Sequence, residues 1–185
     1  MDALELLTTR RSTKNLAAPA PDELQIDSIL QAATQVPDHG ALTPWRFVVI
    51  SSADGKTRYR QALADTVTTL NLGEQAMTKA MRVADMSPLT IAVIFSPNHT
   101  GEKRKPDWEQ QASAACAAYA IQLAAKAQGF DSVWITGAWV HSPVMRAAFE
   151  CSEAEKILAL LEIGTATLSP DGCKNVEVDE FTTYW

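Results

Sequence analysis

Four short runs of mostly apolar residues are the clearest pattern in the chain, and each predicts a buried β-strand. They lie at residues 45–51, 89–95, 132–135 and 157–163, the last closed by Gly164. A continuous apolar run of this length is typical of a strand that is covered on both faces of a sheet. Because helical patterns separate the four runs, we expect an α+β or mixed α/β fold with three layers, in which helices cover both faces of a sheet.

Apolar residues at helical spacing fill most of the chain between these runs. We expect helices at residues 2–9, from Pro21 to Pro37, at 54–85 with a break near Leu72 and Gly73, and from Pro143 onward. Proline suits the first position of a helix, because an N–H there would lack an intrahelical partner in any case. Residues 37–44 then form a loop that leads into the first strand.

The best-defined helix is predicted to run from Asp107 to Gly129. Asp107 can cap its start, Gln110 follows three residues later as in a capping box, and Gly129 can end it. Nine alanines fall between residues 111 and 127. Since such a helix is small on nearly every side, it can pack against several neighbours, and we expect it to be the central helix.

The last part of the chain reads differently from the rest. Residues 165–185 are rich in proline, glycine and acidic residues and end in three aromatics, Phe181, Tyr184 and Trp185. We expect a single domain that spans residues 1–185, with residues 165–185 as its C-terminal arm. The three aromatics have no evident partner within the chain, so an arm that crosses to a second subunit would bury them.

Charge and composition exclude several classes of protein. The chain has 16 Lys+Arg and 22 Asp+Glu, a net charge of −6, which does not suit nonspecific nucleic-acid binding or a polybasic membrane anchor. It has no apolar run of 18 residues, and residues 1–5 lack the basic start of a secretory signal. Cys116, Cys151 and Cys173 are widely spaced, which favours free thiols in the cytoplasm.

The common nucleotide, hydrolase and metal motifs are absent, so no metal site or side-chain nucleophile is expected. A cationic cluster remains, formed by Arg10, Arg11, Ser12 and Lys14. Guanidinium groups bind phosphate with two parallel hydrogen bonds, and the hydroxyl adds a neutral donor. Taken alone, the cluster equally fits a solvated helix end, where cations complement the negative pole of the helix.

Three further features have both a functional and a plain interpretation. His39 could contact a ligand or simply occupy a turn between Pro37 and Pro44. The residues Trp108, Glu109 and Gln110 could belong to a site, or form a capping box with a packed indole. Gly137, after the strand residues Trp134, Ile135 and Thr136, could let the backbone approach a flat ligand closely, or could form an ordinary turn.

Together, these segments resemble the flavin-dependent nitroreductase family, in particular its small members of the YdjA type. The resemblance covers nearly the whole chain in order and is carried by these motifs: Met1-Asp2-Ala3-Leu4-Glu5-Leu6-Leu7, Arg10-Arg11-Ser12, Pro37-Asp38-His39, Pro44-Trp45, Trp108-Glu109-Gln110, Ala127-Gln128-Gly129-Phe130, Trp134 with Gly137-Ala138, and Gly164-Thr165. It implies a largely antiparallel sheet of four or five strands, and FMN bound at the interface of a homodimer.

The resemblance also assigns roles to residues. It implies that Arg10, Arg11 and Ser12 hold the FMN phosphate and ribityl chain, that Lys14 lies near the pyrimidine end of the flavin, and that Gln35 and His39 come from the partner chain. It places Trp134, Ile135, Thr136 and Gly137 along the ring, with backbone amides near N5. A nicotinamide-nucleotide contact is implied more weakly for Ala124, Ala125, Lys126, Ala127, Gln128 and Gly129, since a helix C-terminus does not favour phosphate.

Two departures from the family pattern bear on the flavin site. Asp38, Ala41 and Thr43 stand where many members have Ser and Asn, and only Lys174 is available where many have a basic pair near the C-terminus.

The implied activity is NAD(P)H-dependent reduction of nitroaromatics, quinones or other activated acceptors through FMN, with no catalytic side chain required. Reductive dehalogenation, flavin breakdown and a non-catalytic flavin-binding module are the alternatives on the same fold.

Overall fold

The computed structural model describes residues 2–100, 105–168 and 176–185. The elements in chain order are α1 (Ala3–Thr9), β1 (Leu16–Ala17), α2 (Glu23–Ala33), β2 (Trp45–Ile50), α3 (Ala53–Thr69), α4 (Glu74–Ala84), β3 (Leu89–Phe95), α5 (Asp107–Ala127), β4 (Asp131–Ile135), α6 (Ala138–His141), α7 (Pro143–Ala148), β5 (Lys156–Ala166) and the 3₁₀ helix η1 (Val178–Phe181).

Five strands form one sheet within these described ranges. β3 lies between β2 and β5, β4 pairs with the other side of β5, and β1 pairs with the far end of β5. All of these ladders are antiparallel, with Phe47 opposite Val93 and Ile91 opposite Leu161. A single parallel bridge joins Ser12 to Ser132. The expected α+β fold with a largely antiparallel sheet is therefore confirmed.

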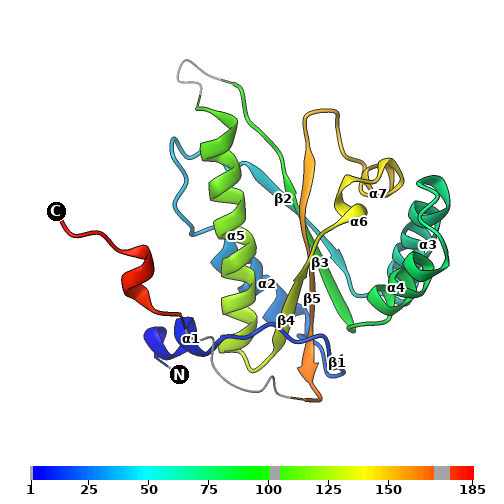
Figure 1. Ribbon diagram of the computed structural model, residues 1–185, viewed down its shortest axis with the longest axis horizontal. Coiled ribbons are helices and arrows are strands. Elements are labelled where there is room, and N and C mark those ends of the chain that lie inside the picture. The colour runs from blue at the N-terminus through cyan, green and yellow to red at the C-terminus, as the bar shows by residue number, and fades with distance from the viewer. Residues whose placement is uncertain (1, 101–104, 169–175) are drawn as a thin grey trace.

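Helices cover both faces of this sheet (Figure 1). Ala92 and Ile94 of β3 pack into one apolar cluster with α3, α4, α6 and α7. Ile91 and Val93 point the other way and pack with α2 and α5. Because both sides of β3 are covered, every residue of this strand is buried, which explains an apolar run in which Thr90 is the one polar residue.

The Ala-rich helix α5 is central, as expected, but it begins differently. Ala114, Ala117 and Ala118 are fully buried against α2 and the sheet. The expected cap at Asp107 is wrong, because Pro106 occupies the cap position and makes no side-chain capping bond. Buried Gln110 instead binds the preceding loop, accepting from the Asn98 N–H at 2.8 Å and donating to the Lys105 carbonyl at 3.0 Å. This side chain therefore fixes a loop rather than completing a capping box.

Strand β5 continues past Gly164, so the expectation that this glycine closes it is wrong. Gly164 pairs with Asp131, and the next two residues pair with β1. A Cβ at Gly164 would lie 2.8 Å from the Ala17 carbonyl oxygen and 2.8 Å from a Pro88 side-chain carbon. Glycine is needed here because the N-terminal segment crosses the sheet at close range.

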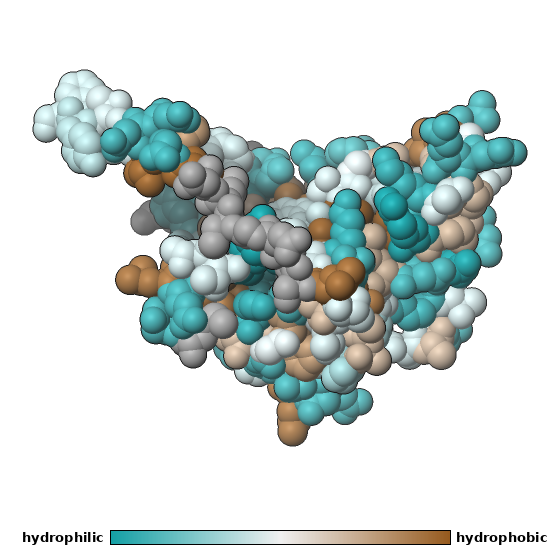
Figure 2. All heavy atoms as spheres, turned by 60° about the horizontal axis from the view of Figure 1, so that its bottom comes forward, coloured by the Kyte–Doolittle hydropathy of each residue, from teal (hydrophilic) through white to brown (hydrophobic). Residues whose placement is uncertain are grey.

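The C-terminal segment extends away from the sheet on the side of α1 (Figure 1) and forms a projection on the surface (Figure 2). Its large apolar side chains, Val178, Phe181, Tyr184 and Trp185, are all exposed, as are Leu4 and Leu7 of α1. Lys174 lies outside the described residues. In the part of the chain that is described, no helix has the length and apolar character needed to cross a bilayer.

Candidate functional site

The N-terminal cationic cluster lies beside β4. The Thr13 N–H donates to the Ser132 carbonyl at 3.2 Å, next to the parallel bridge between Ser12 and Ser132. Because the two segments run in the same direction from this bridge, Lys14 comes alongside the end of β4, where it shares a hollow with Trp134. The structure thus brings together two sequence features that are far apart in the chain.

The hollow beside the end of β4 has a volume of about 470 Å³, within the usual range for a small-molecule site. The end of β4, the start of α6 and one side of α4 enclose it. Its lining includes five predicted site residues: Lys14, Trp134, Ile135, Thr136 and Gly137. The remaining lining residues are Leu72, Ala76, Lys79, Arg82, Val83, Met86, Ala138 and Trp139.

Gly137 gives the hollow an open stretch of backbone. Its φ is 88°, a conformation that other residues rarely adopt, and no atom lies within 4 Å of the position that a Cβ would take. It caps the start of α6 without any side-chain hydrogen bond. A flat ligand can therefore approach the main chain closely at this residue.

Arg10 carries a donor that has no acceptor. Its guanidinium lies 5.9 Å from the ring centre of Tyr119, and its Nη1 donates weakly to Ser12 Oγ at 3.5 Å. Its Nε is buried and has no hydrogen-bond partner among the described residues. A buried unsatisfied donor is costly unless a ligand or water supplies an acceptor. The residues present therefore fit the phosphate of FMN, with Arg11, half-buried, next in the chain.

Gln35 and His39 lie apart from this hollow and line none of it. Gln35 is exposed and donates to Thr34 Oγ1 at 3.2 Å. His39 is 61% exposed and its Nδ1 lies 2.6 Å from Glu109 Oε2, at the start of α5. Their expected role toward the flavin of a partner chain stays a prediction, which the position of both residues on the surface permits.

Glu109 has no role that the sequence alone assigns, and in the structure its carboxylate contacts the ring of His39. A carboxylate that binds Nδ1 fixes the orientation of the His39 ring. The neighbouring Trp108 is 71% exposed, so the interpretation of a packed indole is wrong. The Asp38 side chain forms a hydrogen bond within its own loop, where Oδ2 accepts from the Thr43 N–H at 2.6 Å.

The segment proposed for nicotinamide contact lies at the other end of β4. Lys126 pairs with Asp131 at 2.9 Å, and the Gln128 side chain donates to the Gln25 carbonyl of α2. None of Ala124, Ala125, Lys126, Ala127, Gln128 and Gly129 lines the hollow beside Gly137. Their contact with a nucleotide stays a prediction that the arrangement of the chain does not support.

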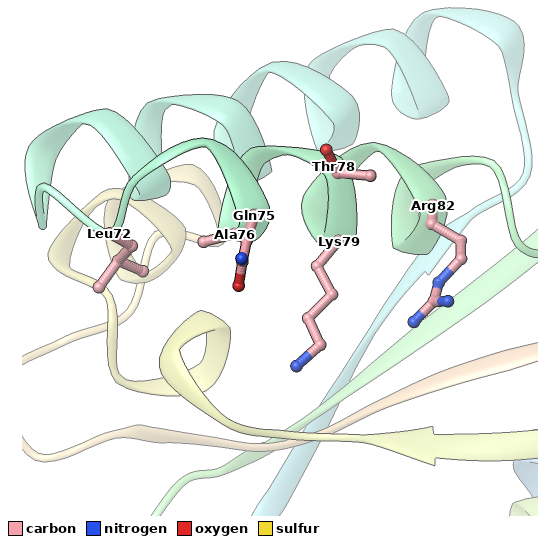
Figure 3. Close-up of a pocket in the computed structure, with 6 residues that line it drawn as sticks. All are labelled: Leu72, Gln75, Ala76, Thr78, Lys79 and Arg82. Atoms are coloured by element: carbon pink, nitrogen blue, oxygen red, sulfur yellow. The ribbon is translucent and has the colours of Figure 1, made fainter.

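Lys79 and Arg82 are site residues that sequence reasoning missed. Both come from α4 and extend toward β4 and α6 (Figure 3). They also line a second hollow of about 570 Å³, together with Leu72, Gln75, Ala76 and Thr78. Their spacing of three residues, which places them on one face of a helix, was the available signal. No group of three or more metal-ligating side chains occurs among the described residues.

Comparison with known protein families gives a match over most of the chain. The model of the family described as "Nitroreductase family" matches residues 7–165. A Haemophilus influenzae protein named "Putative NAD(P)H nitroreductase" is 43% identical over 185 residues, covering all of both chains. An Escherichia coli K12 protein, "Putative NAD(P)H nitroreductase YdjA", is 41% identical over 188 residues, again covering all of both chains.

Solved structures share the fold at low sequence identity. A nitroreductase-like family protein from Bacillus cereus superposes with a TM-score of 0.85 at 19% identity, covering 100% of this chain and 96% of the other. A protein from Exiguobacterium sibiricum, described as a "putative nitroreductase in complex with FMN", has a TM-score of 0.76 at 19% identity, covering 100% and 98%.

Proposed function

The chain belongs to the nitroreductase family, and on that premise we propose that it is a single-domain FMN-dependent oxidoreductase that uses NADH or NADPH to reduce nitroaromatic, quinone or other activated acceptors. The observation that carries this proposal is the meeting of the N-terminal cationic cluster with the open backbone at the end of β4. The FMN complex of a protein with the same fold supports the choice of cofactor.

We assign the cofactor contacts to residues on both sides of this meeting point. Arg10, Arg11 and Ser12 would bind the phosphate and ribityl chain, which would give the buried Nε of Arg10 an acceptor. Lys14 would lie near the pyrimidine ring, where its charge stabilises negative charge. The strand end, Trp134, Ile135, Thr136 and Gly137, would lie along the ring system.

When bound, FMN would supply the redox chemistry, whose net result is a two-electron reduction of the acceptor: NAD(P)H + H⁺ + R–NO₂ gives NAD(P)⁺ + R–NO + H₂O. The chain's own contribution is to bind and orient the reactants and to exclude water from the apolar part of the hollow. Val83, Met86 and Trp139 form part of this apolar lining. No side-chain nucleophile or dedicated acid is assigned.

We further propose a homodimer in the cytoplasm. Gln35 and His39 would reach the site of the partner chain, which accounts for their position outside the hollow of their own chain. The exposed apolar side chains of α1 and of the C-terminal segment would then be covered by the second subunit. Three cysteines without a disulfide pattern support the location.

Acceptor-dependent turnover tests the proposal. The FMN-loaded protein should oxidise NADH or NADPH anaerobically when 4-nitrobenzamide or a benzoquinone is added, and the consumption of acceptor should match that of the nucleotide. A protein that binds FMN but shows no acceptor-dependent oxidation would be a flavin-binding module, and the enzymatic assignment would be wrong.

A further inference from the structure

Helix α4 turns two cations toward the two hollows beside β4. Lys79 and Arg82 line both hollows, and Lys14 joins them in the inner one. Figure 3 shows both α4 side chains extending from the same side of the helix toward the strands. Since the two hollows share these residues, they form one groove that leads from the surface of α4 to Gly137.

The charge of this groove has one sign. Neither hollow is lined by Asp or Glu, and Lys14, Lys79 and Arg82 take part in no ion pair within the described ranges. Arg58 and Arg60 on the adjacent helix α3, by contrast, pair with Asp54 and Asp85. Three uncompensated cations in a chain of net charge −6 create a local positive field that attracts anions.

The same groove has apolar walls next to its cations. The walls of the inner hollow are formed mainly by large apolar side chains, namely Leu72, Val83, Met86, Trp134, Ile135 and Trp139. Apolar walls with a few convergent charges suit a ring that bears an anionic substituent. The α4 cations line the same hollow as Gly137, so an acceptor ring that lies beside Gly137 would have its anionic substituent within the positive field of the groove.

We propose that Lys79 and Arg82 bind the anionic group of the electron acceptor, so that the preferred acceptors are aromatic or enone compounds that carry a carboxylate or sulfonate. This inference rests on the proposed function, because it takes the flavin ring to lie at the end of β4. It gives α4 the role of selecting substrates by charge, whereas Arg10, Arg11 and Ser12 serve the cofactor.

Reoxidation of the reduced enzyme tests the inference without any nucleotide present. The FMN-loaded protein is photoreduced anaerobically and mixed with 4-nitrobenzoate or with 4-nitrobenzamide, its neutral analogue of nearly the same shape. At low ionic strength the wild type should reoxidise about 10- to 100-fold faster, at limiting acceptor, with the anion. Lys79→Gln with Arg82→Gln should remove this ratio, because the rate with 4-nitrobenzoate should fall to the rate that the same variant shows with 4-nitrobenzamide. Arg58→Gln, which removes a cation from α3, is the matched control and should keep the ratio.

The opposite charge gives a second test that does not depend on loss of a contact. Lys79→Glu with Arg82→Glu should make (4-nitrobenzyl)trimethylammonium a better acceptor than 4-nitrobenzoate. Three results would each overturn the inference. The wild type could react equally fast with the anion and the amide, the Gln double variant could lose FMN, or the double substitution could slow only the reduction of the flavin by NAD(P)H. If neither acceptor reoxidises the flavin, the proposed function itself fails; if both do so at equal rates, only the charge selection fails.

Discussion

At the scale of single residues, two buried glutamates have pKa values that are shifted in opposite directions, because their surroundings differ. Arg46 donates two hydrogen bonds to Glu155, at 2.7 and 3.1 Å, and lowers the pKa of that carboxyl to about 2. Burial raises the pKa of Glu162, although Tyr59, Ser87 and Thr90 all donate to it. A hydrogen-bonded cation therefore outweighs burial at Glu155, whereas the neutral donors and the charge of nearby Lys56 do not outweigh burial at Glu162.

Replacing Glu155 should make stability depend less on pH in acid. The pKa of this group falls from 4.5 to about 2 on folding, so its contribution is complete above pH 4.5 and is lost as the pH falls toward 2. Glu155→Gln should lower the free energy of unfolding by about 2–3 kcal/mol at pH 7, and this difference should shrink between pH 4.5 and 2. Urea unfolding across this range measures it, with exposed Glu153→Gln as the control. A difference that stays constant with pH would contradict the ion-pair account.

Gly137→Ala separates the cost of a strained backbone from the loss of ligand contact. Both Gly137 and Gly129 have a φ near 90° and open space around the missing Cβ. Alanine at either position should cost about 1–3 kcal/mol of stability. Only Gly137→Ala should also weaken FMN binding, because Gly137 lines the hollow and Gly129 does not. The expected loss is about tenfold, the usual effect of losing one close polar contact. Flavin fluorescence titrations of both variants decide this, and equal affinities would remove Gly137 from the site.

At the scale of elements, the sequence allowed prediction wherever burial covers a whole element. β3, buried along its whole length, appears as an apolar run with Thr90 as its one polar residue, and the break between α3 and α4 falls at Gly73 as expected. β1 could not be found, because it has two residues and depends on its pairing with β5. For the same reason β5 extends beyond Gly164. Pairing partners far apart in the chain leave no local pattern.

The residues of the candidate site also fall into two groups, those that local sequence motifs reveal and those that only the folded structure reveals. Lys14 and the residues from Trp134 to Gly137 follow from a family resemblance that local motifs carry, and the structure places them around one hollow. Lys79 and Arg82 were missed because their spacing of three residues is a weak signal: polar residues on one side of an amphipathic helix ordinarily face water. Only the packing of α4 against the sheet shows that these two face a hollow.

Gly164→Ala should disturb the crossing of β1 and β5. The new methyl group would lie 2.8 Å from both the Ala17 carbonyl oxygen and Pro88, so the N-terminal segment must shift, at a cost of about 1–3 kcal/mol in unfolding free energy. Since Lys14 lies two residues before β1, FMN affinity should fall as well. Thermal unfolding and FMN titration on the same samples measure both effects. A variant with unchanged stability would show that the crossing is not tight.

At the scale of the whole molecule, the exposed apolar side chains at both ends of the chain form the surface that the proposed dimer would cover. Leu4 and Leu7 of α1 and Phe181, Tyr184 and Trp185 at the C-terminus are exposed, and α1 and the C-terminal segment lie on the same side of the molecule (Figure 1). The three terminal aromatics are visible in the sequence, but the surface that they contact could not be predicted from it, because in the proposed dimer that surface belongs to the second copy.

Removal of residues 178–185 should weaken that dimer. The truncated protein should still fold, because none of these residues is buried, but it should dissociate at low micromolar or lower concentration and lose FMN on dilution. Sedimentation velocity across a dilution series, with flavin absorbance as the signal, follows both events together. A truncated monomer that keeps FMN as tightly as the full chain would contradict the shared site.

The central claim is that FMN binds where the N-terminal cationic cluster meets the end of β4, and its most direct test is the FMN affinity of Arg10→Ala. Arg10 has a buried Nε without an acceptor in the described part of the chain, and each charge-assisted contact to phosphate is worth about 1.5–3 kcal/mol. Arg10→Ala should therefore bind FMN about 10- to 100-fold more weakly than the wild type, whereas the control Arg58→Ala, on the far helix α3, should bind it equally well. Equal FMN affinity in all three proteins would place the cofactor elsewhere.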